Sequence, residues 1–181
     1  MKRIVIIALA FLLLVGCADV AVQPEEPVSV SNEAAEQLQA PADPRLAEAQ
    51  AENPDTVAWL TVPGTNIDGP VQQAEDNEYY LRRNELGEPS HDGCFFADYE
   101  CNLSGDALST NTIIYGHTFT APGQDPNLGF GQLNAFLDAE FAAANTQIFL
   151  SVAERQYTFE IKSAGVASAE QDGVCILASP G

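Results

Sequence analysis

The stretch NTIIYGHTFT, residues 111–120, contains one of only two histidines in a chain of 181 residues. Its first half is a short apolar run bounded by polar residues, a pattern that predicts a buried β-strand. Gly116 follows at the end of this strand, where a missing side chain lets another group approach closely. His117 then occupies a position from which an imidazole can act as a general base or activate a cysteine. From position alone, a structural histidine is the simpler interpretation.

Segments of similar character lie on both sides of this stretch. Residues 56–73, TVAWLTVPGTNIDGPVQQ, alternate β-branched and aromatic residues around turn signals at PGTN and DGP, which predicts two strands joined by a tight turn. GCFFADY at 93–99 predicts another buried strand, and residues 146–167 predict a hairpin that turns at AER. One further short apolar run lies within residues 168–181.

Three segments between these strands favour short helices. RLAEAQAENPD, residues 45–55, contains helix formers and ends at a proline, and residues 75–85 form a brief helical segment. Residues 129–145 carry large apolar side chains at near-helical spacing. We therefore expect a mostly β domain with small helices, arranged as a barrel or a sandwich.

The composition fits one folded domain with appendages, because 46% of the residues are apolar and 18% are charged. The chain has 26 acidic residues against 7 basic ones and a net charge of -19. Such a charge argues against binding to a phosphate backbone or to anionic lipid. We therefore expect no nucleic-acid partner, and we explain the scattered acids by solubility.

The N-terminus has the pattern of a secretory signal sequence, with two basic residues before an apolar run. LVGC, residues 14–17, resembles a bacterial lipobox, in which the cysteine carries lipid after cleavage. We expect a lipoprotein-type signal peptide over residues 1–16, a disordered tether over residues 17–44 that begins at a lipidated Cys17, and the folded domain over residues 45–181. The alternative is an uncleaved anchor helix, although the run is short for the ~20 residues of a bilayer crossing.

The other cysteines are Cys94, Cys101 and Cys175. Cys94 and Cys101 could close a small disulfide in an oxidising exterior, or both could be free. Cys175 lies inside the apolar run VCIL, where a buried and inert thiol is the simpler interpretation. His91 lies in the turn PSHDG and is expected on the surface. No spacing of these residue types fits a metal site and no nucleotide-binding motif occurs, so we expect neither a metal nor a cofactor.

Three long motifs in order resemble the class B sortases, a family of cysteine transpeptidases of Gram-positive bacteria. They are ENPDTVAWLTVPGTNIDGPVQQAEDNEYYLRRN at 52–84, GCFFADYECN at 93–102 and NTIIYGHTF at 111–119. The similarity runs from Leu46 to Ala167.

This resemblance implies a closed eight-stranded β-barrel with short helices, anchored outside the membrane. It also implies a two-step acyl transfer, in which a cysteine attacks the backbone of a sorting signal and an amine of the peptidoglycan precursor resolves the thioester. The histidine of the family that matches His117 handles protons around that cysteine, and a later arginine stabilises the oxyanion. The motif match therefore reverses the interpretation of His117, which becomes the candidate catalytic residue.

The resemblance is incomplete toward the end of the sequence. Family members carry the cysteine at the end of a late strand, but the similar run CILASPG places Pro180 or Gly181 at that position. Arg155 precedes this run and does not match the arginine of the family. The sequence therefore predicts a barrel whose C-terminal strands are missing, and a site in which His117 lacks its cysteine and its arginine.

Three hypotheses about function remain open. The first is a truncated copy of a sortase-family transpeptidase or hydrolase, which would cleave a cell-wall sorting signal and attach surface proteins to peptidoglycan. The second is a catalytically inactive sortase-like lipoprotein that acts as a binding or scaffold module. The third is a shortened enzyme that pairs Cys175 with His117. The implied partners are a sorting-signal peptide, a peptidoglycan precursor amine and the outer face of a Gram-positive cell membrane.

Overall fold

The computed structural model describes residues 3–7, 40–103, 108–119, 125, 128–153, 155–169 and 171–180. The strands are β1 (Arg3–Ile7), β2 (Ala40–Pro41), β3 (Thr56–Thr61), β4 (Asp68–Gln72), β5 (Phe95–Ala97), β6 (Asn111–Tyr115), β7 (Gln147–Val152), β8 (Arg155–Ala169) and β9 (Gln171–Pro180). The helices are α1 (Pro44–Glu52), α2 (Ala139–Ala144) and two 3₁₀ segments, η3 (Tyr79–Arg82) and η4 (Gly129–Leu137). The prediction of a mostly β domain with short helices is confirmed.

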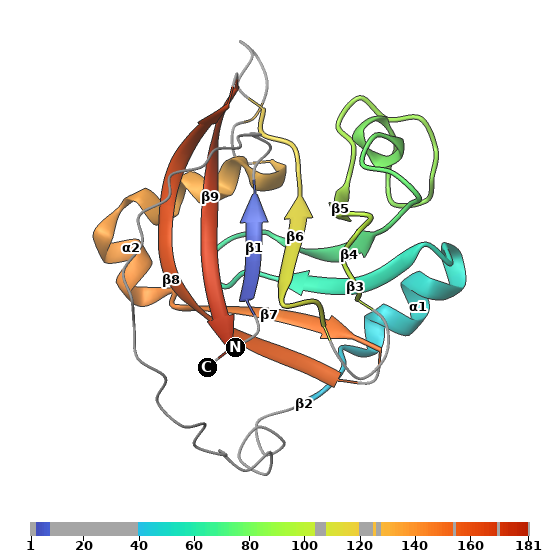
Figure 1. Ribbon diagram of the computed structural model, residues 1–181, viewed down its shortest axis with the longest axis horizontal. Coiled ribbons are helices and arrows are strands. Elements are labelled where there is room, and N and C mark those ends of the chain that lie inside the picture. Colours follow the sequence, from blue (N-terminus) through green and yellow to red (C-terminus); the bar gives the residue numbers. More distant parts are fainter. Residues whose placement is uncertain are drawn as a thin grey trace, which may run out of the picture.

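The strands form one sheet that curls until its ends meet (Figure 1). Their order is β2-β8-β7-β3-β4-β5-β6-β1-β9, and β8 also pairs with β9. That additional pairing joins all strands except β2 into a closed ring of hydrogen-bonded neighbours, in agreement with the expected barrel architecture. The ring is completed by β1 and β9, whereas the sequence had predicted a barrel left incomplete at its C-terminal end. The pairs β4–β5 and β1–β6 are parallel, whereas the other pairs are antiparallel.

The core lies inside the curl of the sheet. Residues of β3 alternate between buried and half-buried positions, as expected for a strand with one face toward the core. β3 and β4 form the predicted hairpin, and the second predicted hairpin turns at Ala153, which has a φ of 53°. Large apolar side chains buried in this core include Leu60, Ile67, Ile114, Phe130, Leu133, Ile148, Leu150 and Phe159.

α1 is fixed to the β3–β4 hairpin by a polar cluster and one apolar contact. The Asp43 carboxylate accepts the Arg45 N–H at 2.9 Å and caps the helix, and Leu46 buries the inner face. The Arg45 guanidinium reaches Asp68 at 2.7 Å and lies over the Trp59 ring at 4.4 Å. Hydrogen bonds from Arg45, Trp59 and Thr61 lower the pKa of Asp68 to about 2. The prediction of a short helix here is thus confirmed, and the structure attaches this helix to the two strands that carry the first motif.

The segment predicted as helical over 129–145 consists of two pieces. η4 ends at Leu137, and Asp138 adopts an extended backbone with ψ of 127° before α2 begins. The Asp138 carboxylate accepts the N–H groups of Glu140 and Phe141, so it caps α2 and separates the two helices. Phe136 and Phe141 then meet edge to face at 5.0 Å. The apolar spacing was read correctly as helical, but the cap that divides it was missed.

β1 lies within residues 1–16, the segment interpreted as a signal peptide, and pairs with β6 and β9. Residues 8–39, which include Cys17 and nearly all of the expected tether, lie outside the described residues. In the part of the chain that the structure describes, no helix has the length and apolar character needed to cross a membrane.

Candidate functional site

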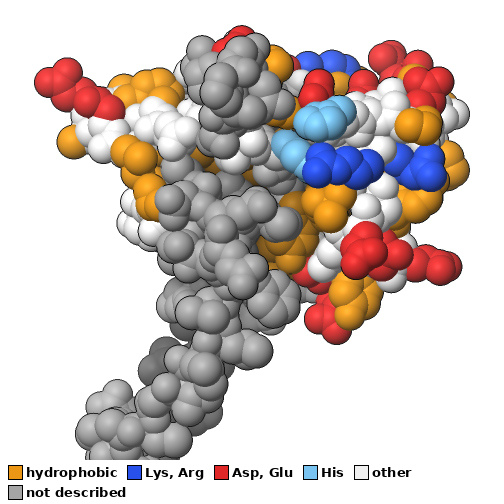
Figure 2. All heavy atoms as spheres, turned by 90° about the horizontal axis from the view of Figure 1, so that it is seen from above, with side chains coloured by type: hydrophobic (Ala, Val, Ile, Leu, Met, Phe, Trp, Pro, Cys, Tyr) orange, Lys and Arg blue, Asp and Glu red, His pale blue; other side chains and the backbone are white. Residues whose placement is uncertain are grey.

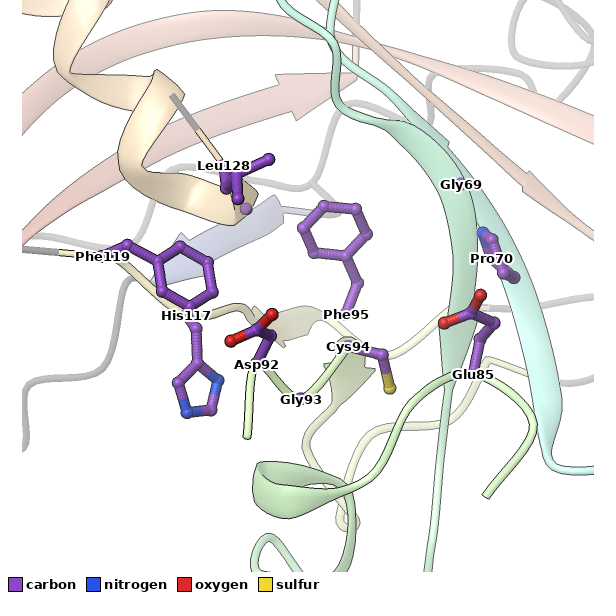
Figure 3. A pocket seen from close by; sticks show the side chains of 11 residues that line it. Gly69, Pro70, Glu85, Asp92, Gly93, Cys94, Phe95, His117, Phe119 and Leu128 are labelled. Carbon is purple, nitrogen blue, oxygen red and sulfur yellow. The ribbon is translucent and has the colours of Figure 1, made fainter. Parts of the chain in front are cut away.

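A pocket of about 310 Å³ lies where the ends of β4, β5 and β6 approach the start of η4 (Figure 3). Apolar side chains and glycines form much of its wall, and two carboxylates, a thiol and an imidazole supply its chemistry. Its lining residues are Gly69, Pro70, Glu85, Asp92, Gly93, Cys94, Phe95, His117, Phe119, Leu128 and Gly129. The three sequence motifs therefore converge on one cavity, and the candidate residue His117 lies in its wall.

Packing explains why a glycine precedes the histidine. A Cβ atom on Gly116 would lie 2.7 Å from two ring carbons of Phe130, which is shorter than any tolerated contact. Phe130 itself is fully buried and stacks on Phe95 with ring centroids 4.8 Å apart. Gly116 thus lets an aromatic ring of η4 pack directly on the backbone next to His117.

The backbone of His117 is held by the first turn of η4. The Phe130 N–H donates to the His117 carbonyl oxygen at 2.8 Å. Gly129 has a φ of +53°, and a Cβ atom there would lie 2.5 Å from that same oxygen. This close approach requires glycine both for its conformation and for its size.

A second glycine supports the imidazole ring. Gly93 has a φ of +61°, and a Cβ atom there would lie 2.9 Å from Nδ1 of His117 and 3.0 Å from Cε1. The ring therefore rests on the backbone of the loop that precedes β5. On another side, the Phe119 ring stacks near the imidazole with centroids 6.3 Å apart. These contacts give His117 a defined orientation at the pocket wall (Figure 3).

The electrostatic surroundings of His117 favour its neutral form. Nη1 of Arg82 lies 3.2 Å from Nε2 of His117. Burial lowers the pKa of His117, and the positive charges of Arg82 and His91 lower it further against the opposing effect of Asp92. A neutral imidazole at physiological pH is able to take up a proton, as a general base must.

Cys94 lies in the same pocket but is a poor nucleophile. Its side chain extends away from the imidazole in Figure 3, toward the side of the pocket that holds Glu85. Burial, and after it the negative charge of the Glu85 carboxylate, raise the pKa of the Cys94 thiol to about 12. The structure describes Cys94 and Cys101 as free thiols, so they do not form the disulfide that the sequence allowed. Cys101 instead accepts the Ile113 N–H through its sulfur at 3.3 Å.

We expect Cys94 to resist alkylation at neutral pH. With a pKa of about 12, its thiolate is scarce below that pH, so iodoacetamide should modify it about 100-fold or more slowly than in the urea-unfolded chain. Peptide mapping by mass spectrometry measures the rate at this site. Glu85→Gln removes the neighbouring negative charge and should speed alkylation, and equal rates in the folded and unfolded chains would contradict this assignment.

The remaining candidates from the sequence are dispersed. On β9, Cys175 pairs with Ile7 of β1, and Ile7 pairs with Tyr115 of β6. The backbone of Cys175 is therefore two strand spacings away from β6, the strand that leads to His117. At about 4.8 Å per spacing, this is about 10 Å. Arg155 begins β8 and pairs with Val152. His91 lies in an exposed bend, with its imidazole near Asp92 at 3.6 Å. The described backbone therefore does not place Cys175 on a strand adjacent to β6.

Known proteins resemble this chain over the part that builds the pocket. No protein-family model matches the sequence. Sortase B of Listeria monocytogenes is 36% identical over 116 residues, which are 64% of this chain and 44% of that protein. The crystal structure of a mutant form of Clostridium perfringens sortase B superposes with a TM-score of 0.59 at 35% identity, covering 68% of this chain and 55% of that one. The chain is a homologue of sortase B.

Another sortase B shares this fold at lower identity. The Staphylococcus aureus sortase B–substrate complex gives a TM-score of 0.62 at 26% identity and covers 72% of this chain and 57% of that one. The chain spans less than half the length of the curated sortase B relatives that it matches. Sequence similarity and structural similarity thus both point to the sortase B family.

Sequence reasoning missed two groups that shape the site of this sortase B homologue. Arg82 lies in the motif YYLRRN, which was used only for the resemblance, although it contacts His117 across 35 residues of sequence. Gly93 opens the motif GCFFADYECN and carries the ring of His117 on its backbone. Two features of the sequence could have pointed to these groups. Gly93 lies at the start of a predicted strand, and Arg82 is one of two adjacent arginines in a very acidic chain.

Proposed function

We propose that the pocket beside His117 binds a sorting-signal peptide, and that His117 moves the proton in a thiol-dependent acyl transfer to an amine. The observation that carries this proposal is the convergence of all three sortase-like motifs on one cavity with His117 in its wall. Homology to sortase B supports the reaction class.

The chemistry of the pocket suits an extended peptide. Phe95, Phe119 and Leu128 offer apolar surface for side chains, and Leu128 is half exposed at 50%. Asp92 and Glu85 provide acceptors for the N–H groups of a peptide backbone. A peptide that lies across this surface would pass the imidazole of His117.

The reaction in this proposal has two balanced steps. A reactive thiol, which the described pocket residues do not supply, gives its proton to the neutral imidazole, and the resulting thiolate adds to a peptide carbonyl. The carbon–nitrogen bond breaks, and the departing amine takes the proton from the imidazolium. A second amine then attacks the thioester and gives its proton to the imidazole, and the displaced thiolate takes that proton back, which restores the thiol and the neutral imidazole. The acceptor in this scheme is an amine of the peptidoglycan precursor, and water in its place would give hydrolysis.

A binding module is the second candidate, and the state of Cys94 favours it. Among the described side chains, Cys94 is the one thiol that lines the pocket, and burial raises its pKa to about 12. A thiol with this pKa supplies too little thiolate for acyl transfer at neutral pH. In this second proposal the pocket holds a sorting signal without cleaving it.

Peptide binding and cleavage separate the two candidates. We expect fluorescein-labelled sorting-signal peptides from surface proteins of the same organism to bind the full-length chain, as measured by fluorescence anisotropy. If the chain cleaves them, His117→Ala should reduce the rate by about 10²–10⁴-fold while binding persists. His91→Ala is the matched control, because the His91 side chain is exposed, and it should keep the rate. Binding without cleavage supports the module, and neither binding nor cleavage would overturn both proposals.

We further propose that the domain is held at the outer face of a Gram-positive cell membrane by lipid on Cys17. The lipobox-like LVGC at 14–17 and the preceding apolar run support this proposal. Mass spectrometry of the membrane fraction tests it. A mature N-terminus at Cys17 with attached acyl chains is expected, and any other mature N-terminus would contradict it.

A further inference from the structure

Arg82 is the cation nearest to the imidazole of His117. One of its guanidinium nitrogens, Nη1, donates to the His91 carbonyl oxygen at 3.0 Å and lies 3.2 Å from Nε2 of His117. Figure 2 shows the two histidine side chains next to Lys and Arg side chains on one face of the molecule. Arg82 ends η3, so the helix and the loop that carries His91 together fix its position.

The direction of this hydrogen bond follows from the chemistry of the two groups. A guanidinium has only donors and stays charged at every accessible pH. Nε2 of His117 must therefore accept, and an accepting Nε2 carries no proton. A neutral imidazole keeps one proton, so that proton resides on Nδ1.

We propose that Arg82 is a positioning residue that fixes His117 as the neutral tautomer protonated at Nδ1, with Nε2 occupied by the guanidinium. Protonation of Nε2 would remove the hydrogen bond and place two cations in contact. Among the residues that the structure describes, no carboxylate lies within ion-pair distance of Arg82, so its charge acts on the imidazole without a paired acid.

Other charged groups face the ring from each neighbouring element. His91 and Asp92 approach from the loop before β5, and their effects on the pKa of His117 oppose one another. Glu85 and Cys94 line the pocket beyond them. Arg82 is the one of these groups with a direct contact to a ring nitrogen.

This contact has a consequence for proton transfer that rests on the proposed role of His117. While Arg82 donates to Nε2, that nitrogen cannot take a proton from a thiol or an amine. Nδ1 faces the backbone of Gly93, where a Cβ atom would lie 2.9 Å away. Proton uptake at Nε2 therefore requires the guanidinium to move, so Arg82 controls when His117 acts as a base.

Nitrogen NMR of the imidazoles tests the proposal without any activity measurement. The full-length chain contains two histidines, so ¹⁵N-histidine labelling gives two sets of ring signals, and His91→Asn assigns them. We expect Nδ1 of His117 to resonate as a protonated nitrogen and Nε2 as an unprotonated one. The opposite pattern in the wild-type chain would overturn the proposal, whatever happens to the variants.

Substitution at position 82 tests the cause. Arg82→Met removes charge and donor, so the titration midpoint of His117 should rise and the preference for the Nδ1 tautomer should weaken. Arg82→Lys keeps a charged donor and should restore part of both effects. Arg83→Met is the matched control, since Arg83 donates to the Gly87 carbonyl at 2.8 Å and stacks on Tyr79 instead. An unchanged midpoint in a folded Arg82→Met chain would refute the role of Arg82. Failure of peptide binding would leave these signals unaffected.

Discussion

Truncation of Phe130 to alanine is expected to lower the free energy of unfolding by about 3–5 kcal/mol. The Phe130 ring is fully buried, stacks on Phe95 and covers the bare backbone of Gly116. Its loss leaves a cavity directly behind His117, which the rigid sheet cannot fill. Urea unfolding followed by circular dichroism measures the loss.

Two further variants show whether the ring acts through the contacts described. Leu128→Ala is the control from the same segment, because Leu128 is 50% exposed, and it should change stability by less than about 1 kcal/mol. Gly116→Ala should destabilise the wild-type chain by overpacking, and should do so much less in the Phe130→Ala background. Additive effects of the two substitutions would contradict the packing assigned to Gly116.

Gly129→Ala is expected to lower the free energy of unfolding by about 2–4 kcal/mol, because two penalties combine. An L-residue at a φ of +53° is strained, and the new Cβ would lie 2.5 Å from the His117 carbonyl oxygen. That oxygen belongs to the backbone and accepts the Phe130 N–H, so it cannot move away without loss of the hydrogen bond. The same unfolding measurement applies, and the NMR signals of His117 should shift with it.

The chain offers glycines that separate these two penalties. Gly87 has a φ of +79°, but a Cβ atom there would meet no atom closer than 3.9 Å, so Gly87→Ala should cost only the strain of about 1–2 kcal/mol. A Cβ atom on Gly165 would have no neighbour within 4 Å, and Gly165→Ala should be close to neutral. Equal losses at Gly129 and Gly87 would show that the contact with His117 is not tight.

Local patterns predicted most of the fold correctly. The β3–β4 hairpin and the turn at Ala153 follow from alternation interrupted by turn residues, which are signals contained within a few positions. The division of the segment after Gly129 was missed because helical spacing continues across Asp138, and only the capping geometry reveals the break. The prediction followed the helical spacing of the apolar residues, and it therefore did not recognise Asp138 as the cap of a second helix.

The sequence pointed to one residue of the candidate site, His117, and its catalytic role stays a prediction. Its strand and its motif drew attention to His117, but the groups that hold its side chain and backbone were not predicted. Its supports are Phe130, Gly93 and Arg82, which lie up to 35 residues away, and no local pattern brings them together. The glycine before His117 was noticed, whereas its partner, the Phe130 ring, required the fold.

The position of β1 bears on how the chain matures. Arg3–Ile7 is the parallel neighbour of β6, and it lies in the stretch that was interpreted from its sequence as a signal peptide. Residues 3–7 cannot be part of the sheet in a mature chain from which the signal peptide has been cleaved. If it is cut, the backbone of NTIIY on that flank loses its hydrogen-bond partners right beside His117, and such an edge pairs readily with a strand from another chain. Cleavage of the proposed leader would therefore remove the strand between β6 and β9 and open the ring of strands at this point.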